Sequence, residues 1–243
     1  MSKIVIVAEA GVNHLGNMHL AHEMILRAKD VGSDLWKTQL YDPEKLFPDR
    51  RIIAQGKNWF DEVMKTRLNK EQVFQLAEWC QESQIEFFAS CFDLERLGWL
   101  EEVRVKKHKV ASREIQDRPL IEAIIATGKP IIASLGWWDI ESKGVPPLFC
   151  DADVYYLYCI SKYPTPLEEL HLARIDFEHD YQGFSDHTIG IEAPMIAMAR
   201  GAKIIEKHFT LDKNLPGPDQ ICSIKPNELK RLVKFARKVE EIL

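Results

Sequence analysis

Eight short β-rich runs alternate with helical stretches along the whole of this 243-residue chain. Such alternation is typical of a parallel sheet whose strands are joined by crossover helices. The expected strands are residues 4–11, 34–41, 86–92, 105–112, 130–136, 154–160, 184–187 and 203–209. Eight such units in a chain of this length predict an α/β fold, with one (β/α)8 TIM barrel occupying residues 1–243 as a single domain.

The outer helices are predicted from apolar residues at helical spacing. They are expected at 18–31, after the cap residue Asn69, and at 119–127, 167–174, 191–201 and 226–243. The fifth position differs, because Pro146 and Pro147 leave room for only about one helical turn after the fifth strand. We therefore expect the fifth outer helix to be shortened or missing. The connection 42–68 is longer than compact packing requires and is expected to be an active-site loop.

Composition and charge exclude several classes of function. The net charge is −5 and the basic residues are dispersed, so binding to nucleic acid is not expected. The apolar runs are far shorter than the ~20 residues of a membrane helix, so no membrane span is expected. The N-terminal apolar run passes straight into polar residues without a secretory cleavage site, which indicates a cytoplasmic protein. The five cysteines form no Cys-x-x-Cys pair and are expected to be reduced thiols: Cys80, Cys91, Cys150, Cys159 and Cys222.

Polar residues gather at the predicted strand ends, which meet on the rim where barrel enzymes carry their active sites. They are Glu9, Lys37, Gln39, Ser90, Lys109, Ser112, Glu114, Ser134, Ser161, Ser185, His187, Glu206 and His208. A lysine inside a barrel mouth is costly unless it meets an anion, so Lys37 and Lys109 predict an anionic substrate. One serine alone would more simply bond to the backbone. Several serines around two lysines could instead bind a phosphate and a carboxylate.

Two histidines are predicted to lie side by side, because His187 and His208 end the two strands of one β-α-β unit. Four further polar residues are expected close to them: Ser185, Asp186, Glu206 and Asp219. Neutral imidazoles with carboxylates in reach suit Mn, Zn or Fe better than Mg or Ca. A single strand-end histidine would more simply form a hydrogen bond, but two on adjacent strands favour a metal.

Two competing interpretations concern other nucleophiles. Class I aldolases also place a lysine on an inner barrel strand, so a Schiff-base lysine is the alternative to an anion site. The paired histidines favour the metal enzyme. Cys91 is a nucleophile candidate by position, but the sequence places no histidine beside it. It is therefore expected to pack or to line a phosphate site.

Six motifs in collinear order resemble the catalytic barrel of the sialic acid synthases. They are AEAGVNHLG at 8–16, WKTQ at 36–39, HKVASRE at 108–114, YPTP at 163–166, GFSDHT at 183–188, and EKHFTLD at 206–212 with GPD at 217–219. Those enzymes join phosphoenolpyruvate to an N-acetylated amino-sugar such as N-acetylmannosamine. The resemblance implies a metal-dependent transferase of carbohydrate biosynthesis that forms a sialic-acid-like nonulosonate and releases phosphate.

The resemblance also implies roles for single residues. His187 and His208 match ligands of a divalent metal, usually Mn²⁺. Residues matching the phosphoenolpyruvate site are Lys37, Lys109, Ser112, Ser134 and Ser185. Glu9 matches a carboxylate beside the reacting carbons, and those matching sugar contacts are Gln39, Glu114, Tyr163 and Asp219. With the strand-end positions added, the candidate catalytic residues are Glu9, Lys109, Asp186 and Glu206, and Ser90 and Ser161 join the substrate-binding set.

The chain also departs from the family pattern. Full-length members continue into a small antifreeze-like domain that reaches the partner's site in the dimer and supplies an arginine to the sugar, whereas this sequence ends at Leu243. Cys91 replaces a threonine, Ser161 an asparagine and Arg113 a glycine. The partners expected from the resemblance are therefore a second copy of the chain or a separate antifreeze-like protein.

Two other functions stay open. A heptulosonate-phosphate-type synthase would use the same donor with a phosphorylated sugar, and extra arginines on the rim would favour it. Only Arg113 is evident there. A degenerate ligand-binding barrel is the non-enzymatic alternative, and the retention of both histidines and both lysines argues against it.

Overall fold

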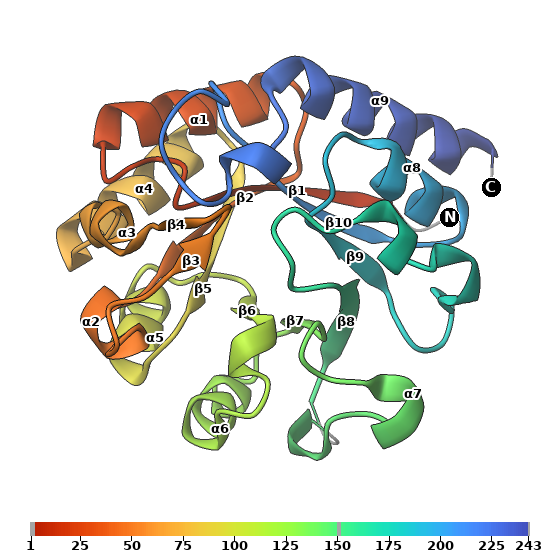
Figure 1. The fold of residues 1–243 in the computed structure, drawn as a ribbon, viewed down its shortest axis with the longest axis horizontal. Coiled ribbons are helices and arrows are strands. Elements are labelled where there is room, and N and C mark those ends of the chain that lie inside the picture. Colours follow the sequence, from red (N-terminus) through yellow and green to blue (C-terminus); the bar gives the residue numbers. More distant parts are fainter. Residues whose placement is uncertain (1–2, 150–151, 243) are drawn as a thin grey trace.

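The computed structural model describes residues 3–149 and 152–242. In this part of the chain eight parallel strands close into a barrel in the order β1-β10-β9-β8-β7-β6-β5-β2 (Figure 1). The strands are β1 (Val5–Gly11), β2 (Leu35–Leu40), β5 (Glu86–Cys91), β6 (His108–Val110), β7 (Ile131–Ser134), β8 (Val154–Cys159), β9 (Gly183–Asp186) and β10 (Ile204–His208). The predicted barrel is confirmed. The largest difference in a strand is at 105–112, where the regular strand is only His108–Val110.

Outer helices surround most of the barrel (Figure 1). They are α1 (Met18–Asp30), α4 (Lys70–Glu82), α5 (Leu94–Glu102), α6 (Arg118–Ala126), α8 (Glu192–Ala199) and α9 (Pro226–Ile242). The predicted cap Asn69 accepts from the Gln72 backbone N–H at 2.8 Å, and the Gln72 side chain accepts from the Asn69 N–H at 2.9 Å. This is a capping box, which satisfies two N–H groups that a helix start leaves unpaired. Helix α5, which begins after the cap Asp93, was not among the expected helices.

The sector over β7 and β8 has little regular helix. Helix α7 (Ile140–Lys143) is a single turn, as the two prolines predicted. The helix expected at 167–174 is wrong, because this segment forms two 3-10 turns, η3 (Leu167–Glu169) and η4 (Leu172–Arg174). His171 between them has a φ of 45°, which lies in the left-handed region and interrupts a right-handed helix.

The long connection after β2 is folded. It contains α2 (Pro43–Leu46), the hairpin β3 (Ile53–Ala54) and β4 (Lys57–Asn58), and α3 (Phe60–Lys65). We call residues 42–68 the arm. Its apolar residues Leu46, Phe47 and Val63 pack with Val12 and Tyr41 at the barrel rim. At the hairpin tip, Gln55 donates through Nε2 to the Pro218 carbonyl at 3.0 Å. The arm therefore stands on the rim instead of extending into solvent.

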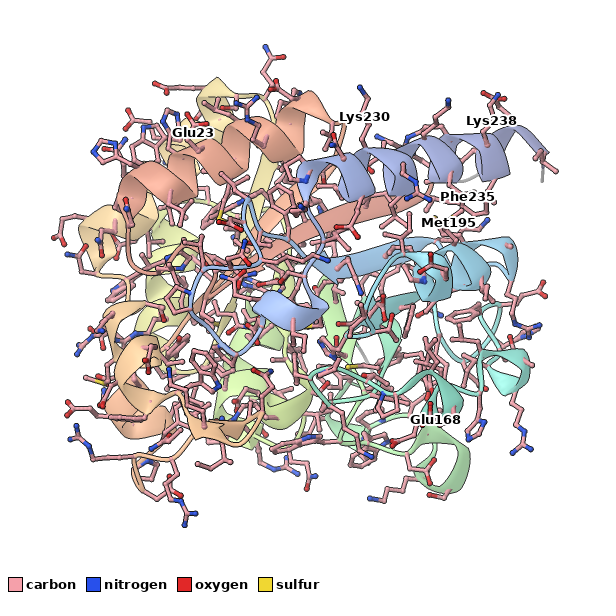
Figure 2. All side chains as sticks on the ribbon, turned by 45° about the horizontal axis from the view of Figure 1, so that its top comes forward. Glu23, Glu168, Met195, Lys230, Phe235 and Lys238 are labelled. Atoms are coloured by element: carbon pink, nitrogen blue, oxygen red, sulfur yellow. The ribbon has the colours of Figure 1, made fainter. Side chains whose placement is uncertain are left out.

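Apolar layers fill the rest of the barrel. Inside it a cluster is formed by Val7, Leu35, Phe88, Ile132, Leu157 and Ile204. A larger cluster lies between the strands and the outer helices. Figure 2 shows Met195 of α8 and Phe235 of α9 between these two contacting helices, whereas Glu23, Lys230 and Lys238 point outward. Because apolar residues occupy the lower barrel, the inward polar residues are confined to its C-terminal end.

Two further expectations concern cysteines and membranes. Four cysteines in the described ranges are free and buried, and Cys150 lies outside those ranges. Within residues 3–149 and 152–242, no helix is both long enough and apolar enough to cross a bilayer.

Candidate active site

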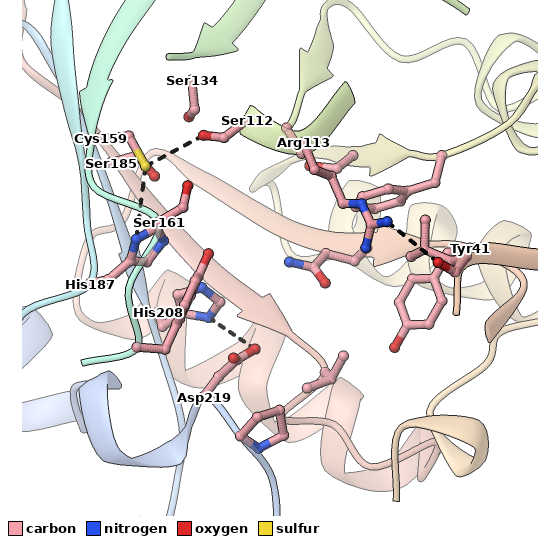
Figure 3. A pocket seen from close by; sticks show the side chains of 18 of the residues that line it. Tyr41, Ser112, Arg113, Ser134, Cys159, Ser161, Ser185, His187, His208 and Asp219 are labelled. Atoms are coloured by element: carbon pink, nitrogen blue, oxygen red, sulfur yellow. Dashed lines mark hydrogen bonds and ion pairs between the residues drawn. The ribbon is translucent and has the colours of Figure 1, made fainter. Parts of the chain in front are cut away.

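A pocket of about 310 Å³ opens at the C-terminal ends of the strands (Figure 3). Thirteen of the sixteen candidate residues line it: Lys37, Gln39, Ser90, Lys109, Ser112, Ser134, Ser161, Tyr163, Ser185, His187, Glu206, His208 and Asp219. Glu9, Glu114 and Asp186 are not among the lining residues. The period-2 alternation of strands explains the grouping, because side chains two residues apart point to the same side.

Four buried charged side chains form the floor of the pocket. Lys37 is paired with Glu9, which lies just below the lining residues. Lys37 Nζ is also 3.7 Å from Glu206 Oε2, and Lys109 Nζ is 3.9 Å from Glu206 Oε1. Both lysines are only 2% exposed. Two cations and two carboxylates thus share one water-poor site, which we call the charge quartet.

Serine hydroxyls extend the charge quartet toward the cavity. Lys109 Nζ donates to Ser134 Oγ at 2.7 Å and to the Val110 carbonyl at 3.0 Å. Ser185 Oγ donates to Glu206 Oε1 at 3.1 Å. These groups put several polar hydrogens on one side of the pocket, which is the arrangement that binds phosphate or carboxylate oxygens.

Burial and mutual attraction set the charges of the quartet. Burial raises the pKa of Glu9, in opposition to Lys37. Burial would also raise the pKa of Glu206, but Lys109 and Lys37 outweigh it and hold that pKa below its ordinary value. Burial lowers the pKa of Lys109, whereas Glu206 and Glu9 outweigh burial at Lys37 and raise its pKa. Glu206 and Lys37 therefore hold their charges most firmly, and Glu9 is the carboxyl that takes up a proton most readily.

The two histidines meet as predicted. Their ring centroids are 5.5 Å apart, and the ring of Tyr163 lies 4.0 Å from that of His187. His187 Nδ1 is 2.9 Å from the Ile160 carbonyl, which fixes the ring and leaves Nε2 for another partner. Gly11 permits this packing, because a Cβ there would lie 2.9 Å from His208 Cε1 and its φ is +51°.

The histidine pair fits a metal in its donor atoms. Buried His208 Nδ1 has no hydrogen-bond partner in the described structure and is 3.7 Å from Asp219 Oδ2. Burial, with His187 adding to it, lowers the pKa of His208 well below its usual range, so the ring is the neutral form that binds metals. In the described ranges, no three His, Cys, Asp or Glu side chains form a ready ligand group. The residues that could hold a metal are therefore the two imidazoles, with Asp219 adjacent.

The outer end of the pocket combines carboxyl groups with apolar walls. Burial raises the pKa of Asp219 to about 6. Arg113 is 5.0 Å from the Phe47 ring centroid and donates to the Leu46 carbonyl at 3.4 Å. Arg113 Nε is 3.0 Å from Glu114 Oε1, but the two are not aligned as a hydrogen bond. Burial outweighs this cation and raises the pKa of Glu114 to about 7.

Some residues lie elsewhere than their assigned roles suggested. Asp186 points away from the pocket, where it accepts from Lys207 Nζ at 2.6 Å and from the Thr188 N–H at 2.8 Å. This placement fits a structural ion pair better than direct catalysis. Cys91 is buried outside the pocket lining, and burial raises its pKa to about 12, which agrees with a packing role.

Three features of the pocket were not among the predicted site residues. Arg113 was considered only as a departure from the family pattern and as the single arginine evident on the rim. The arm was expected to be an active-site loop because of its length, but no residue of its apolar wall, such as Phe47 or Ile53, was predicted to line the site. Cys159 accepts from Ser112 Oγ at 3.6 Å and is 3.8 Å from His187 Nδ1. Its strand-end position two residues before Ser161 was a signal that could have placed it there.

The NeuB family model matches residues 24–243. The chain belongs to the NeuB family. The N,N'-diacetyllegionaminic acid synthase of Legionella pneumophila is 33% identical over 98% of this chain and 72% of its own length. An uncharacterized protein of Methanocaldococcus jannaschii is 37% identical over 98% of this chain and 71% of its own length. The expected resemblance to sialic acid synthases is thereby confirmed.

A solved NeuB-like structure confirms the fold over nearly the whole chain. The N-acetylneuraminic acid (sialic acid) synthetase of Leptospira borgpetersenii superposes with a TM-score of 0.90 at 33% identity. The similarity covers 99% of this chain and 85% of that one.

Proposed function

We propose that this chain joins phosphoenolpyruvate to an amino-sugar aldehyde like N-acetylmannosamine, giving a sialic-acid-like nonulosonate and phosphate. The charge quartet carries the proposal, because Lys37 and Lys109 are buried beside a cavity lined with hydroxyls. Buried ammonium groups are costly and are retained where an anion compensates them. Family membership supports the same chemistry, since related proteins are named as synthases of legionaminic and N-acetylneuraminic acids.

The donor would lie over the quartet. Lys109 and Ser134 form one binding group, while Ser112 and Ser185 face the same cavity. These donors match a ligand with both a phosphate and a carboxylate. They hold the phosphate and the carboxylate of the donor close to its enol carbon. These two anionic groups stabilise the positive charge that develops on that carbon.

Glu9 is the proposed proton carrier. Its raised pKa lets the carboxyl hold a proton that its neighbour Glu206 does not hold. Glu9 Oε1 is buried and without a hydrogen-bond partner in the described structure, so this oxygen is free to accept a proton. The carboxyl can take the proton that a water loses as it adds to the reacting carbon.

A divalent ion, Mn²⁺ by the family resemblance, is part of the proposal. His187 and His208 would hold it, and when bound it supplies Lewis acidity to the aldehyde oxygen. In His187→Ala and His208→Ala we expect loss of Mn²⁺ binding in calorimetry and nearly unchanged Tm without metal. His179→Ala, an exposed histidine paired with Asp176, is the control. Equally tight Mn²⁺ binding by both pocket variants would disprove the assignment.

The outer end of the pocket would bind the acceptor, and the partner is proposed from the family resemblance. Gln39, Tyr163 and Asp219 are the proposed sugar contacts, and they share the cavity with Arg113. A second copy of the chain or a separate antifreeze-like protein is the proposed partner.

The decisive experiment measures donor binding and phosphate release separately. With Mn²⁺ present, calorimetry should detect phosphoenolpyruvate binding to the isolated chain. A panel of aldehyde sugars, with and without N-acetyl and phosphate groups, should then identify an acceptor that triggers phosphate release. Release only with a phosphorylated sugar that lacks the N-acetyl group would favour the heptulosonate-type synthase. Absence of any phosphoenolpyruvate binding would favour the degenerate barrel.

A further inference from the structure

A second cavity, of about 440 Å³, lies at the ends of β7 and β8. Tyr158 lines this cavity. Successive side chains of a strand point to opposite sides, so Tyr158 points away from the barrel interior, where its neighbour Leu157 lies. The cavity exists because α7 is one turn long and residues 167–174 form only 3-10 turns, so no long helix covers this sector (Figure 1). Cavities of this size are typical of small-molecule sites.

The lining of this cavity has an excess of positive charge. Lys143 and Arg174 line it, and Asp139 is the one carboxylate among its described lining residues. Asp139 is already engaged by the side chain and the N–H of Ser142. Arg174 has no ion pair in the described part of the chain. A basic cavity in a chain of net charge −5 points to an anionic ligand.

The backbone that carries Arg174 is held in place. Arg200 donates through Nη2 to the carbonyls of Ala173 and Ile175, at 3.1 Å and 3.3 Å. The Arg174 N–H also donates to the His171 carbonyl at 2.8 Å. A ligand at this guanidinium therefore would not have to order the segment first, which is a saving in entropy for binding.

Aromatic rings supply a flat surface next to the cations. Trp137 is 57% exposed although it borders both this cavity and the active pocket. The next residue, Trp138, donates through Nε1 to the Gly144 carbonyl at 2.9 Å, and this bond fixes the Trp138 indole. A large exposed indole beside basic groups is suited to a ring stacked on its face.

We propose that this cavity binds a phosphate monoester that carries a ring, with the phosphate at Arg174 and the ring against Trp137. A nucleoside monophosphate and a sugar phosphate share this chemistry. The site is separate from the charge quartet, but Trp137 and Cys159 border both cavities.

The test uses AMP, glucose 6-phosphate and inorganic phosphate as probes in calorimetry with the full chain. At least one ring-bearing probe should bind with a Kd near or below about 1 mM and more tightly than inorganic phosphate. Arg174→Gln should weaken that binding about tenfold or more, because it removes a charge-assisted contact. The tighter of the two ring-bearing probes identifies the ring class.

Two controls separate this site from other anion sites. Arg231→Gln alters an exposed arginine on α9, across the barrel from α7 (Figure 1), and should bind like the parent. Lys109→Ala disables the donor end of the active pocket and should retain binding. Binding lost in Lys109→Ala but kept in Arg174→Gln would overturn the proposal. So would inorganic phosphate binding as tightly as both other probes, or no saturable binding at all.

Discussion

The pKa values of single residues in the active pocket depend on two opposed effects, burial and the attraction of nearby charges. Lys109 illustrates them, because its ammonium is buried, its pKa is lowered by burial, and Glu206 compensates only at 3.9 Å. Such a group is poorly compensated until an anion arrives. The free protein therefore carries an electrostatic cost that donor binding would relieve.

Lys109→Ala is expected to lose most phosphoenolpyruvate binding. A hydrogen bond to a charged group contributes about 1.5–3 kcal/mol, so calorimetry should show roughly a tenfold or larger increase in Kd. The free energy of unfolding should also fall, because buried Glu206 loses one of the two cations that compensate its charge. Lys129→Ala, which removes a cation paired with Glu101 outside the pocket, is the control. Unchanged donor affinity in Lys109→Ala would contradict the role of the charge quartet.

Glu114 should make stability depend on pH. Its pKa is raised from 4.5 to about 7, so between these values the folded chain binds more protons than the unfolded chain. The free energy of unfolding therefore falls as pH rises through this window and levels off above it. One pKa unit corresponds to about 1.4 kcal/mol, so the loss across this window is a few kcal/mol at most.

Glu114→Gln removes this titration. We expect the free energy of unfolding of the variant, minus that of the parent, to be larger at pH 8 than at pH 5. Denaturant unfolding measures this difference. A stability difference that is the same at both pH values would show that the Glu114 carboxyl does not titrate in the window.

Elements of the barrel differ in how locally they are determined. Helix α4 begins where its own sequence directs it, through the Asn69 and Gln72 pair. The segment 167–174 has apolar spacing like a helix, but left-handed His171 divides it. Helix α5 was not predicted. Gly98 lies in the middle of it, and glycine lowers the intrinsic propensity of a segment to form a helix.

Asn69→Ala should destabilise the protein without altering the pocket. Loss of the cap is expected to lower the free energy of unfolding by about 1 kcal/mol. In a domain of this size that corresponds to about 2–4 °C in Tm. Asn227→Ala changes an exposed asparagine in the first turn of α9 and should have little effect. Equal Tm values for the two variants would show that the capping box contributes nothing measurable.

The whole molecule is closed by contacts between the two ends of the chain. Arg237 of α9 donates to Asp34 Oδ2 at 2.7 Å, to the Ile4 carbonyl at 2.9 Å and to Glu240 at 2.5 Å. The Ile4 N–H in turn donates to Glu240. The bonds to Asp34 and between Ile4 and the last helix join residues more than 200 positions apart and hold that helix against the start of β1.

Arg237→Ala is expected to lower the free energy of unfolding by about 1–2 kcal/mol, since it removes the charge-assisted hydrogen bonds to Asp34 and to the Ile4 carbonyl. Thermal unfolding should show this loss as one cooperative transition with a lower Tm. The neighbouring Lys238→Ala removes an exposed pair with Glu241 and should change Tm little. A loss as small in Arg237→Ala as in Lys238→Ala would mean that these bonds do not stabilise the closed barrel.

Local sequence was enough to predict the barrel, the short fifth helix and the strand-end position of the histidines. These follow from periodicity, from two prolines and from the rule that parallel strands end on one rim. It was also enough to bring Lys37 and Lys109 to the pocket. Only the tertiary structure decided that the pKa of Glu9 is raised and that of Glu206 is lowered. The two residues are of the same type, and they differ in how they are placed relative to the two lysines. The tertiary structure also turned Asp186 away from the pocket and opened the cavity at Arg174, since both depend on what packs beside a residue and not on its neighbours in the chain.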